Sequence, residues 1–459
     1  MEEILLLHTN DLHSHLENWP QMRRYLTKRQ QEMNQPQKSV ITIDLGDFVD
    51  RWHALSEATQ GQANVALMNQ GNYDVVTIGN NEGLGNSKKA LNELYEEANF
   101  EVLLANLFDQ GTLKRPRWAK PYKIITTALG TKVGLIALTA YFPLTYAPNG
   151  WDIRDPLEIL PELVLHLRPQ VDVLVVMSHL GIDADHLIAK ELPQVDVVLG
   201  SHTHHLFPEG KRVNGVQLAA AGKHGKYIGE VSLFLENNQL IQTKATTIET
   251  AQLPKQLADE QEIQGYLAEG EALLTSRKVA QVPRKFVAEP FVADSLLPLT
   301  LAAMNERAQT EVAIVNSGLF LTDLASGLVT QADLHRLLPH PMHLIKVDLT
   351  GRDVRRLVFE IEKNRNFLRN FPIMGMGFRG KIFGHVVYEG LFYDEINHEV
   401  YWHGQPLVDD KQYQLTTVDH LMFVPFFPTI EIVGEVEFLF PEFIRSVLGN
   451  YLEAHYPTI

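Results

Sequence analysis

Hydrophobic residues in the first half of the chain gather in short runs that alternate with amphipathic stretches. Amphipathic stretches lie at 87–99 and 157–168. Short runs that are rich in β-branched residues predict strands that are buried on both faces. Their alternation with helical stretches predicts an α/β domain with largely parallel strands. The runs begin near Ile4, Val40, Asp74, Glu101, Lys132, Val171 and Val195.

The pattern changes near residue 250. Residues 250–280 are polar, favour helix and contain few Gly or Ser residues, so we expect a connecting helix and not a flexible tether. From residue 281 on, helical stretches at 294–309 and 352–363 mix with the strand-like segments HLIKVDLT, HVVYEGLFYD and YQLTTVD, which indicates an α+β domain. A chain of 459 residues is too long for one ordinary core. The predicted domains are therefore 1–249 and 281–459, joined by 250–280.

Composition restricts the classes of partner and site. The net charge of −16 argues against binding to a nucleic-acid polymer or an anionic membrane, but a phosphorylated small molecule can still bind through divalent cations. The absence of cysteine excludes disulfides and thiolate metal sites. The chain has no apolar run of membrane-spanning length, and its start, MEEILLLHTND, lacks the basic region of a secretory signal. We therefore expect a cytoplasmic protein.

Polar residues of metal-binding type follow several of the predicted strands. In an open α/β sheet, ligands bind beyond the carboxyl ends of the strands. In an extended segment, residues two apart point to the same side, so Asp11 and His13 can converge on one ion. With only nitrogen and oxygen ligands, the expected ions are Mn, Zn, Fe or Co, and two such ions can hold a phosphate and activate water. The strand-end residues are Asp11, His13, Asp47, Asn80, Asn81, His179, His202 and His204.

Other polar residues nearby leave two interpretations open. His15 and Glu17 either support the metal ligands or lie in a solvated loop. His53 and His205 are either catalytic acids or ordinary loop histidines. Arg51 either contacts a phosphate or forms a surface ion pair.

The order of the motifs TNDLHSH, GDFVD, GNNE, SHLG and GSHTH resembles that of the calcineurin-like metallophosphoesterases, and within them the 5′-nucleotidase family, in particular a bacterial cytoplasmic subgroup. The later segments IVNSGLF and HPMHLIKVDLTGRDVRRLV also resemble that family. The resemblance implies a four-layered αββα catalytic domain and a C-terminal substrate-binding domain. It also implies two divalent metal ions: one held by Asp11, His13 and His204, the other by Asn80, His179 and His202, with Asp47 bridging both.

The implied activity is hydrolysis of a nucleotide or another small phosphoester by a metal-bridging hydroxide, with Asn80 and Asn81 orienting phosphate oxygens. Three departures from the family are visible. Asn81 replaces the histidine of the family's G-N-H-E motif, and the aspartate that usually partners that histidine is missing. The segment NSGLFL lacks the arginine that usually contacts substrate, and the two aromatic residues that usually sandwich the base have no clear counterpart.

Asparagine cannot carry a proton, and general acid help is worth about 10²–10⁴ in rate. The loss of the histidine therefore predicts a preference for substrates with good leaving groups. The alternative is a metal- and nucleotide-binding protein with little turnover. Some related enzymes hydrolyse sulfur-carrier conjugates, a third possibility that no feature of this sequence favours.

The C-terminal domain contributes the candidate substrate contacts. In the glycine-rich segment PIMGMGFRGKIFGH, Phe378 and Phe383 can stack a base while Arg379 holds a phosphate or ribose. The alternative is a glycine-hinged loop whose aromatic rings pack on the domain. Asn316, in the IVNSGLF segment, is a further candidate. The sequence does not specify an oligomeric state.

Overall fold

The computed structural model describes residues 1–375 and 377–458. The chain divides into two compact units, Met1–Gly270 and Glu271–Ile459. The division falls within helix α9 (Leu257–Ser276), which lies inside the predicted connecting segment 250–280. Within the described residues, no helix combines the length and the apolar character needed to cross a membrane.

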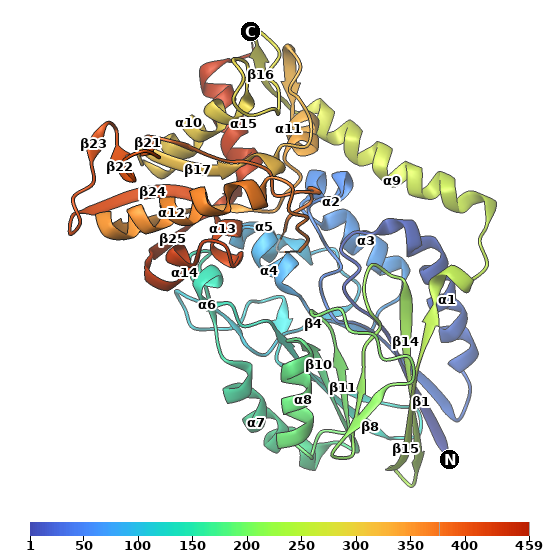
Figure 1. Cartoon of the computed structure of the whole chain (residues 1–459). Helices are drawn as coiled ribbons and strands as arrows, with labels where there is room; N and C mark the ends of the chain where they lie inside the picture. The colour runs from blue at the N-terminus through green and yellow to red at the C-terminus, as the bar shows by residue number, and fades with distance from the viewer. Residues whose placement is uncertain (376, 459) are drawn as a thin grey trace. The chain divides into compact units, whose positions relative to one another are not determined.

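The first unit contains two large sheets (Figure 1). The first has the order β15-β14-β1-β2-β3-β4-β6, with parallel pairing from β1 to β6 and an antiparallel hairpin, β14–β15, added beside β1. The strands are β1 (Glu2–Thr9), β2 (Lys38–Asp44), β3 (Val75–Val76), β4 (Glu101–Leu103), β6 (Ala119–Lys120), β14 (Tyr227–Glu236) and β15 (Gln239–Glu249).

The second sheet has the order β12-β13-β11-β10-β8-β7. Its four middle strands pair in parallel, and both edge strands are antiparallel. The strands are β7 (Tyr122–Thr126), β8 (Lys132–Thr139), β10 (Val173–His179), β11 (Val197–Gly200), β12 (Lys211–Val213) and β13 (Val216–Ala219). Outside the two sheets, β5 (Leu107–Asp109) pairs with β9 (Trp151–Ile153).

Alternating side chains show how the two sheets are layered. In β1, Ile4 and Leu6 enter a core that also contains Val175 of the second sheet, so this core lies between the sheets. Leu5 and Leu7 point the other way, into a core shared with helices. Because successive strand residues point to opposite faces, each sheet is buried on both sides. This explains why the strands are continuous apolar runs.

Helices form the two outer layers. Helices α1, α3 and α5 contribute to the core on the outer face of the first sheet, and α7 and α8 to that of the second. Helix–sheet–sheet–helix layering confirms the predicted four-layered αββα domain (Figure 1). The helices of this unit are α1 (Trp19–Met33), α2 (Ala54–Thr59), α3 (Gln62–Gln70), α4 (Asn80–Gly85), α5 (Lys88–Leu94), α6 (Pro143–Tyr146), α7 (Pro156–Leu167) and α8 (Ile182–Glu191).

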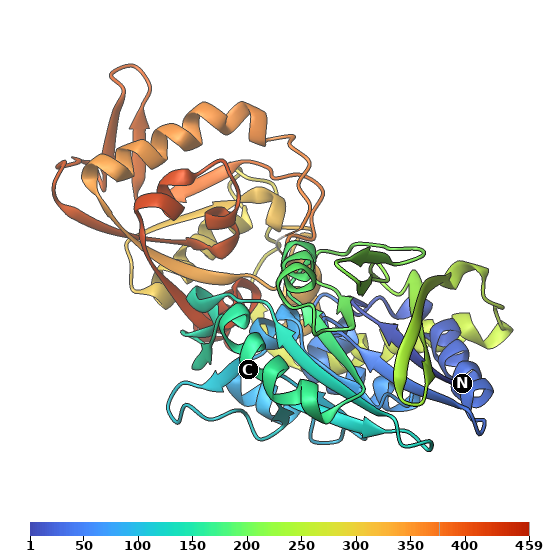
Figure 2. The same ribbon diagram turned by 90° about the horizontal axis from the view of Figure 1, so that it is seen from below.

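The second unit is built on a mixed sheet of order β20-β17-β24-β19-β25 and has one core cluster of its own. Helix α12 packs on β19 and β24, and α10 packs on β17 and β24 (Figure 2). The strands of this sheet are β17 (Val312–Asn316), β19 (His343–Thr350), β20 (Val386–Glu389), β24 (Gln412–Val418) and β25 (Glu435–Phe443). The helices are α10 (Leu296–Ala308), α11 (Gln331–Leu337), α12 (Gly351–Leu368), α13 (Asp419–Phe423), α14 (Pro428–Val433) and α15 (Ile444–His455).

One predicted strand of this unit is divided. The segment HVVYEGLFYD forms β20 and then β21 (Leu391–Asp394), which belongs to a separate small sheet with β22 (Glu399–Trp402) and β23 (Gln405–Pro406). Gly390 lies between them at φ +80°, a conformation that ends an extended strand. A further two-stranded sheet joins β16 (Lys278–Val282) to β18 (Gly327–Thr330).

Candidate metal centre

Segments that follow five strands bring the predicted metal-binding residues together in the first unit. Strands β1, β2 and β3 are neighbours in one sheet, and β10 and β11 are neighbours in the other. The carboxyl ends of these parallel strands therefore deliver side chains to two clusters. The clusters consist of Asp11, His13 and His204, and of Asp47, His179 and His202.

In the first cluster, one ligand atom from each side chain lies within 4.8 Å of the others. The Nε2 atoms of His13 and His204 are 3.1 Å apart. They lie 3.8 and 3.6 Å from Oδ1 of Asp11. Two imidazole nitrogens and a carboxylate oxygen that face one point are a donor set that divalent metals prefer.

The second cluster has the same 4.8 Å limit among Asp47, His179 and His202. Asp47 Oδ2 lies 3.4 Å from His179 Nε2 and 3.7 Å from His13 Nε2, so this carboxylate faces both clusters. Within the described residues, buried His179 Nε2 forms no hydrogen bond beyond its ion-pair contact with Asp47, and buried Oδ1 of Asn80 forms none. Buried polar atoms without a partner are costly, and a bound cation would satisfy both of these. The donor set and these two atoms fit a dinuclear centre.

Hydrogen bonds on the far side of the rings orient them. His179 Nδ1 donates to the carbonyl of Leu45 at 2.7 Å, and His13 Nδ1 lies 3.4 Å from Oδ2 of Asp50. In both rings Nε2 is therefore the nitrogen that faces the cluster. Such outer partners set the tautomer and direction of a metal-binding histidine.

Glu82 holds the loops that carry Asp47 and Asn80. Its carboxylate accepts backbone N–H groups of Asp47 at 2.9 Å, Val49 at 2.8 Å and Gly79 at 2.8 Å. Burial, followed by the charge of Asp47, raises the pKa of Glu82 to about 7. Glu82 therefore ties the loop after β2 to the start of α4.

Burial opposes charge in this centre, and neighbouring groups decide the outcome. Burial raises the pKa of Asp11. Burial acts in the same direction on Asp47, but the charges of His179 and His13, together with the hydrogen bonds that Asp47 accepts, outweigh it and hold the pKa of Asp47 well below its ordinary value. Burial lowers the pKa of His202 to about 4 and that of His204 to about 3. These two rings are therefore neutral near pH 7, which is the form that binds metals.

Five of these residues have backbones in the left-handed region. The φ angles are +50° for Asp11, +50° for His13, +54° for Asp47, +73° for His202 and +60° for His204. Such conformations are uncommon outside glycine and cost about 1–3 kcal/mol each. They let a chain leaving a strand turn sharply and aim its side chain back toward the sheet edge.

Asn81, which stands where the family has a histidine, is bound to the shared carboxylate. Its backbone N–H donates to Oδ1 of Asp47 at 2.8 Å, and its side-chain Nδ2 donates to Oδ2 at 2.6 Å. The amide group of Asn81 therefore holds Asp47 in this structure.

The remaining candidates of this unit do not belong to either cluster. Arg51 pairs with Glu57 at 2.7 Å, as its ion-pair alternative expected. His205 Nδ1 lies 2.9 Å from the hydroxyl of Thr203 and outside both clusters. His53 caps the start of α2 by accepting the N–H of Leu55.

A histidine that sequence reasoning missed lies beside the first cluster. The ring centroid of His224 is 5.8 Å from that of His13, 6.4 Å from that of His204 and 3.7 Å from that of His15. The side chain follows β13 as the ligands follow their own strands, so the signal that found them was also present here. The segment that carries His224, GKHGK, does not match any of the metal-binding motifs of the sequence.

In the second unit, the candidate aromatic residues are packed inside the core. Phe378 is 3% exposed and Phe383 is 0% exposed. The rings of His340 and His420 each stack with Phe378 at 5.3 Å and 16°. This favours the packing alternative for the glycine-rich loop, and a substrate role for the two phenylalanines stays a prediction.

The other two candidates of this unit lie close by. Asn316 is buried and donates from Nδ2 to the carbonyl of Phe383 at 2.8 Å, while its Oδ1 has no hydrogen-bond partner among the described residues. Arg379 is half-buried, and its backbone N–H donates to His340 at 2.9 Å. Met376, in the same predicted loop, lies outside the described residues. Substrate contacts by Asn316 and Arg379 stay predictions.

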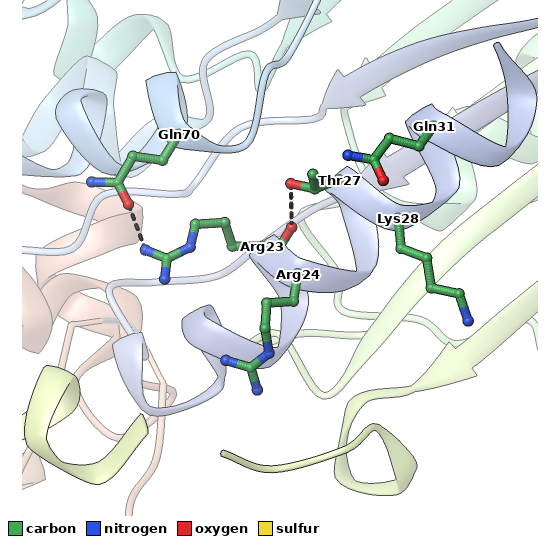
Figure 3. A pocket seen from close by; sticks show the side chains of 6 residues that line it. All are labelled: Arg23, Arg24, Thr27, Lys28, Gln31 and Gln70. Atoms are coloured by element: carbon green, nitrogen blue, oxygen red, sulfur yellow. Dashed lines mark hydrogen bonds between the residues drawn. The ribbon is translucent and has the colours of Figure 1, made fainter. Parts of the chain in front are cut away.

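A cationic surface cavity of about 510 Å³ lies on α1 and the end of α3, and no residue of either cluster lines it (Figure 3). Arg23 forms paired hydrogen bonds with Glu262 at 2.8 and 3.0 Å, and Arg24 does so with Asp259 at 2.6 and 2.8 Å. Both carboxylates belong to α9, so these arginines fasten the start of α9 to α1. The cavity is lined by Arg23, Arg24, Thr27, Lys28, Gln31 and Gln70.

Comparison with known proteins agrees with this geometry. Residues 4–206 match the calcineurin-like phosphoesterase family, and residues 278–423 match the 5′-nucleotidase C-terminal domain. The chain is 36% identical to the uncharacterized metallophosphoesterase YunD of Bacillus subtilis strain 168, over 98% of each chain.

Two solved structures share its fold. The NAD nucleotidase of Haemophilus influenzae has a TM-score of 0.66 at 17% identity, over 99% of this chain and 96% of that one. The 5′-nucleotidase precursor of Thermus thermophilus has a TM-score of 0.58 at 21% identity, over 99% and 97%. The chain therefore belongs to the calcineurin-like metallophosphoesterases and carries the C-terminal domain of the 5′-nucleotidases.

Proposed function

We propose that this chain is a dinuclear metal-dependent phosphohydrolase that acts on nucleotides or other small phosphoesters. The observation that carries the proposal is the position of Asp47 between two clusters of ligand type. A single carboxylate that faces both clusters is the arrangement that two-metal hydrolysis requires. Membership of the family supports the same conclusion.

The protein side chains would divide into two ligand sets. Asp11, His13 and His204 would hold one ion. His179, His202 and Asn80 would hold the other, and Asp47 would bind both. When bound, two divalent ions such as Mn, Zn, Fe or Co supply an activated water nucleophile and positive charge for the phosphoryl oxygens.

Asn81 would act on the shared carboxylate and not on the leaving group. Its two N–H groups donate to the two oxygens of Asp47, which fixes the orientation of that carboxylate. An amide has no proton to give at neutral pH, so the leaving group departs without help from this position. Because such help is worth about 10²–10⁴, the proposal includes a preference for good leaving groups.

The test is metal analysis of the full chain followed by a hydrolysis assay, which measures inorganic phosphate from the phosphomonoesters and the mononucleotide products from NAD. The chain is stripped with a chelator and reloaded with Mn, Zn or Co. The substrate panel includes AMP, p-nitrophenyl phosphate and NAD, the last because a structural neighbour is named an NAD nucleotidase. We expect two ions per chain, metal-dependent turnover, and a higher kcat/KM for p-nitrophenyl phosphate and NAD than for AMP.

Matched variants complete the test. Asp47→Asn should abolish turnover, whereas Asp410→Asn, which changes an exposed carboxylate with 93% of its side chain accessible, should leave it unchanged. Two bound ions without hydrolysis of any substrate, measured as phosphate from the monoesters and as AMP from NAD, would contradict the hydrolase. Equal kcat/KM for AMP and the aryl ester would contradict only the leaving-group preference.

A further inference from the structure

Three planar rings outside the proposed ligand set lie beside the first cluster: those of His15, Trp52 and His224. We call these three residues the ring row. The centroid of His15 lies 4.9 Å from that of Trp52, at an interplanar angle of 44°. On its other side, His15 stacks on His224 at 3.7 Å and 23°. The indole N–H of Trp52 donates to the carbonyl of His13 at 2.7 Å, which anchors the row to a ligand-bearing loop.

His224 is the member of the row nearest the ligands. Its ring meets that of His13 edge-on, at 5.8 Å and 87°, and lies 6.4 Å from that of His204. The Nε2 atoms of these two ligands converge, so the ring of His224 borders the space in which an ion and its substrate would lie.

The backbone of His224 is held tightly in an unfavourable conformation. Its N–H donates to the carbonyl of Asp11 at 2.7 Å, and its carbonyl accepts Nδ2 of Asn18 at 2.8 Å. The φ angle is +59°, which is uncommon for a residue other than glycine. Strained backbones that persist at a site often place a side chain for function.

The ring nitrogens of His224 are nevertheless unused. Within the described part of the chain, neither has a hydrogen-bond partner, although the side chain is half-buried. Its neighbour His15, by contrast, places Nδ1 2.7 Å from Glu17. A ring that is fixed by stacking and by its backbone, but has free polar atoms, is prepared for an external ligand.

Asn81, a candidate donor to the phosphoester, is already partly engaged. The transition state of phosphoryl transfer concentrates charge on oxygens that need positioned N–H groups or cations. Asp47 engages one N–H of the Asn81 side chain, which leaves that amide a single further N–H to offer. His224 approaches from another loop and can offer one N–H as a neutral imidazole, without gaining or losing a proton.

We propose that His224 binds substrate, donating a ring N–H to a non-bridging oxygen of the phosphoester, and that His15 and Trp52 are positioning residues that hold its ring plane. This inference rests on the proposed function, because it places a phosphoester at the metal centre. It adds a substrate contact that the resemblance to the family did not provide.

The experiment compares His224→Ala, His224→Gln and His15→Ala with His166→Ala in the full chain. His166 is an exposed histidine in the last turn of α7 and serves as the matched control. Each variant is measured for bound metal, for kcat/KM on p-nitrophenyl phosphate, and for the dissociation constant of inorganic phosphate by calorimetry on the Mn-loaded protein.

We expect His224→Ala to keep its metals, to lose about 10²-fold in kcat/KM and to bind phosphate more weakly, because a donor aimed at developing charge is lost. His224→Gln should recover part of both losses, since its amide can still donate. His15→Ala should lose less than His224→Ala, and His166→Ala should match the parent.

Either of two results for His224→Ala would overturn the inference. One is a kcat/KM and a phosphate affinity within twofold of the parent. The other is a loss of activity that only parallels a loss of metal, which would make His224 a structural support of the ligands. If the parent releases no phosphate, the proposed function fails, and the phosphate titration alone then decides the inference.

Discussion

A single methyl group at position 79 should disable the metal centre. Gly79 precedes Asn80 and has φ −97° and ψ −170°, an extended conformation that alanine adopts freely. A Cβ at this position would lie 2.5 Å from Cγ of Asp47 and 2.5 Å from Cε1 of His179, and closer still to Oδ1 of Asp47. The substitution therefore tests space alone, since no backbone strain is added.

The size of the effect follows from these distances. Ordinary contact begins at 3.4 Å, so Asp47 or His179 must move by about 0.9 Å. Metal–ligand distances tolerate changes of about 0.2 Å, and misplacing a reacting group by about 1 Å can cost 10²-fold in rate. We expect Gly79→Ala to lose metal at sub-saturating concentrations and at least about 10²-fold in kcat/KM, with an overpacking cost of about 1–3 kcal/mol.

The assay measures metal content by mass spectrometry, phosphate release under saturating metal, and the free energy of unfolding in urea. Gly265→Ala is the control, because that glycine lies in α9 with no heavy atom within 4 Å of an added Cβ. The control should gain up to about 1 kcal/mol of helix stability and keep full activity. If Gly79→Ala retained two ions and a kcat/KM within twofold of the parent, the assignment of Asp47 and His179 to one compact cluster would be wrong.

Three further substitutions test packing inside the two units. Asp185 accepts the hydroxyl of Ser178, and burial raises the pKa of this carboxyl from 3.8 to about 7. Its protonated form therefore makes its full contribution to the free energy of unfolding below about pH 4, and about 4 kcal/mol of that contribution is lost by pH 7. Asp185→Asn should therefore gain stability over the parent as the pH rises from 4 to 8 in chelator-treated urea unfolding, and parallel profiles would contradict this. A Cβ at Gly229 would overlap the buried ring of His8, so Gly229→Ala should lower the free energy of unfolding by about 1–3 kcal/mol, but much less in a His8→Ala background. Equal losses in both backgrounds would refute that contact. Phe378→Ala should cost the second unit about 3–5 kcal/mol with an unchanged KM for AMP if the ring only packs, whereas a tenfold rise in KM with normal stability would identify it as a substrate contact.

The apolar runs predicted seven strands of the first unit, because these strands are covered on both faces, whereas the hairpin β14–β15, whose outer strand is partly exposed, was not predicted. The predicted strands are β1, β2, β3, β4, β8, β10 and β11. Ile4 and Leu5 are both fully buried although they point to opposite sides of β1. The same pattern arises whether a sheet lies between two layers of helices or between helices and a second sheet. Periodicity alone could not choose between these arrangements, and the four layers came from the family resemblance. The sequence did not predict that one strand is divided at Gly390, because its apolar pattern continues across the break.

Residue type and position after a strand were sufficient to select the metal-binding candidates. Asp47 and His179 have similar surroundings in the sequence, each directly following a buried run, and the structure brings them to 3.4 Å. His224 was not predicted because the glycine-flanked segment GKHGK that carries it matches none of the motifs, although it too follows a strand, β13. The sequence did not predict the burial of Phe378, because His340 and His420, whose rings stack with it, come from two distant segments.

The same assembly explains why bound cations would stabilise this centre. Folding places the carboxylates of Asp11 and Asp47 close enough to influence each other in a buried site, and the charge of Asp47 adds to burial in raising the pKa of Asp11. Without a metal, the balancing positive charge comes from His179, whose pKa is lowered by burial but raised by Asp47 to about 10 overall. Replacing that proton with a divalent ion would free Nε2 of His179 as a ligand and relieve the repulsion between the carboxylates. The residues that would bind metal are therefore also those that disfavour the metal-free fold, so metal affinity and folding stability should be linked in this domain.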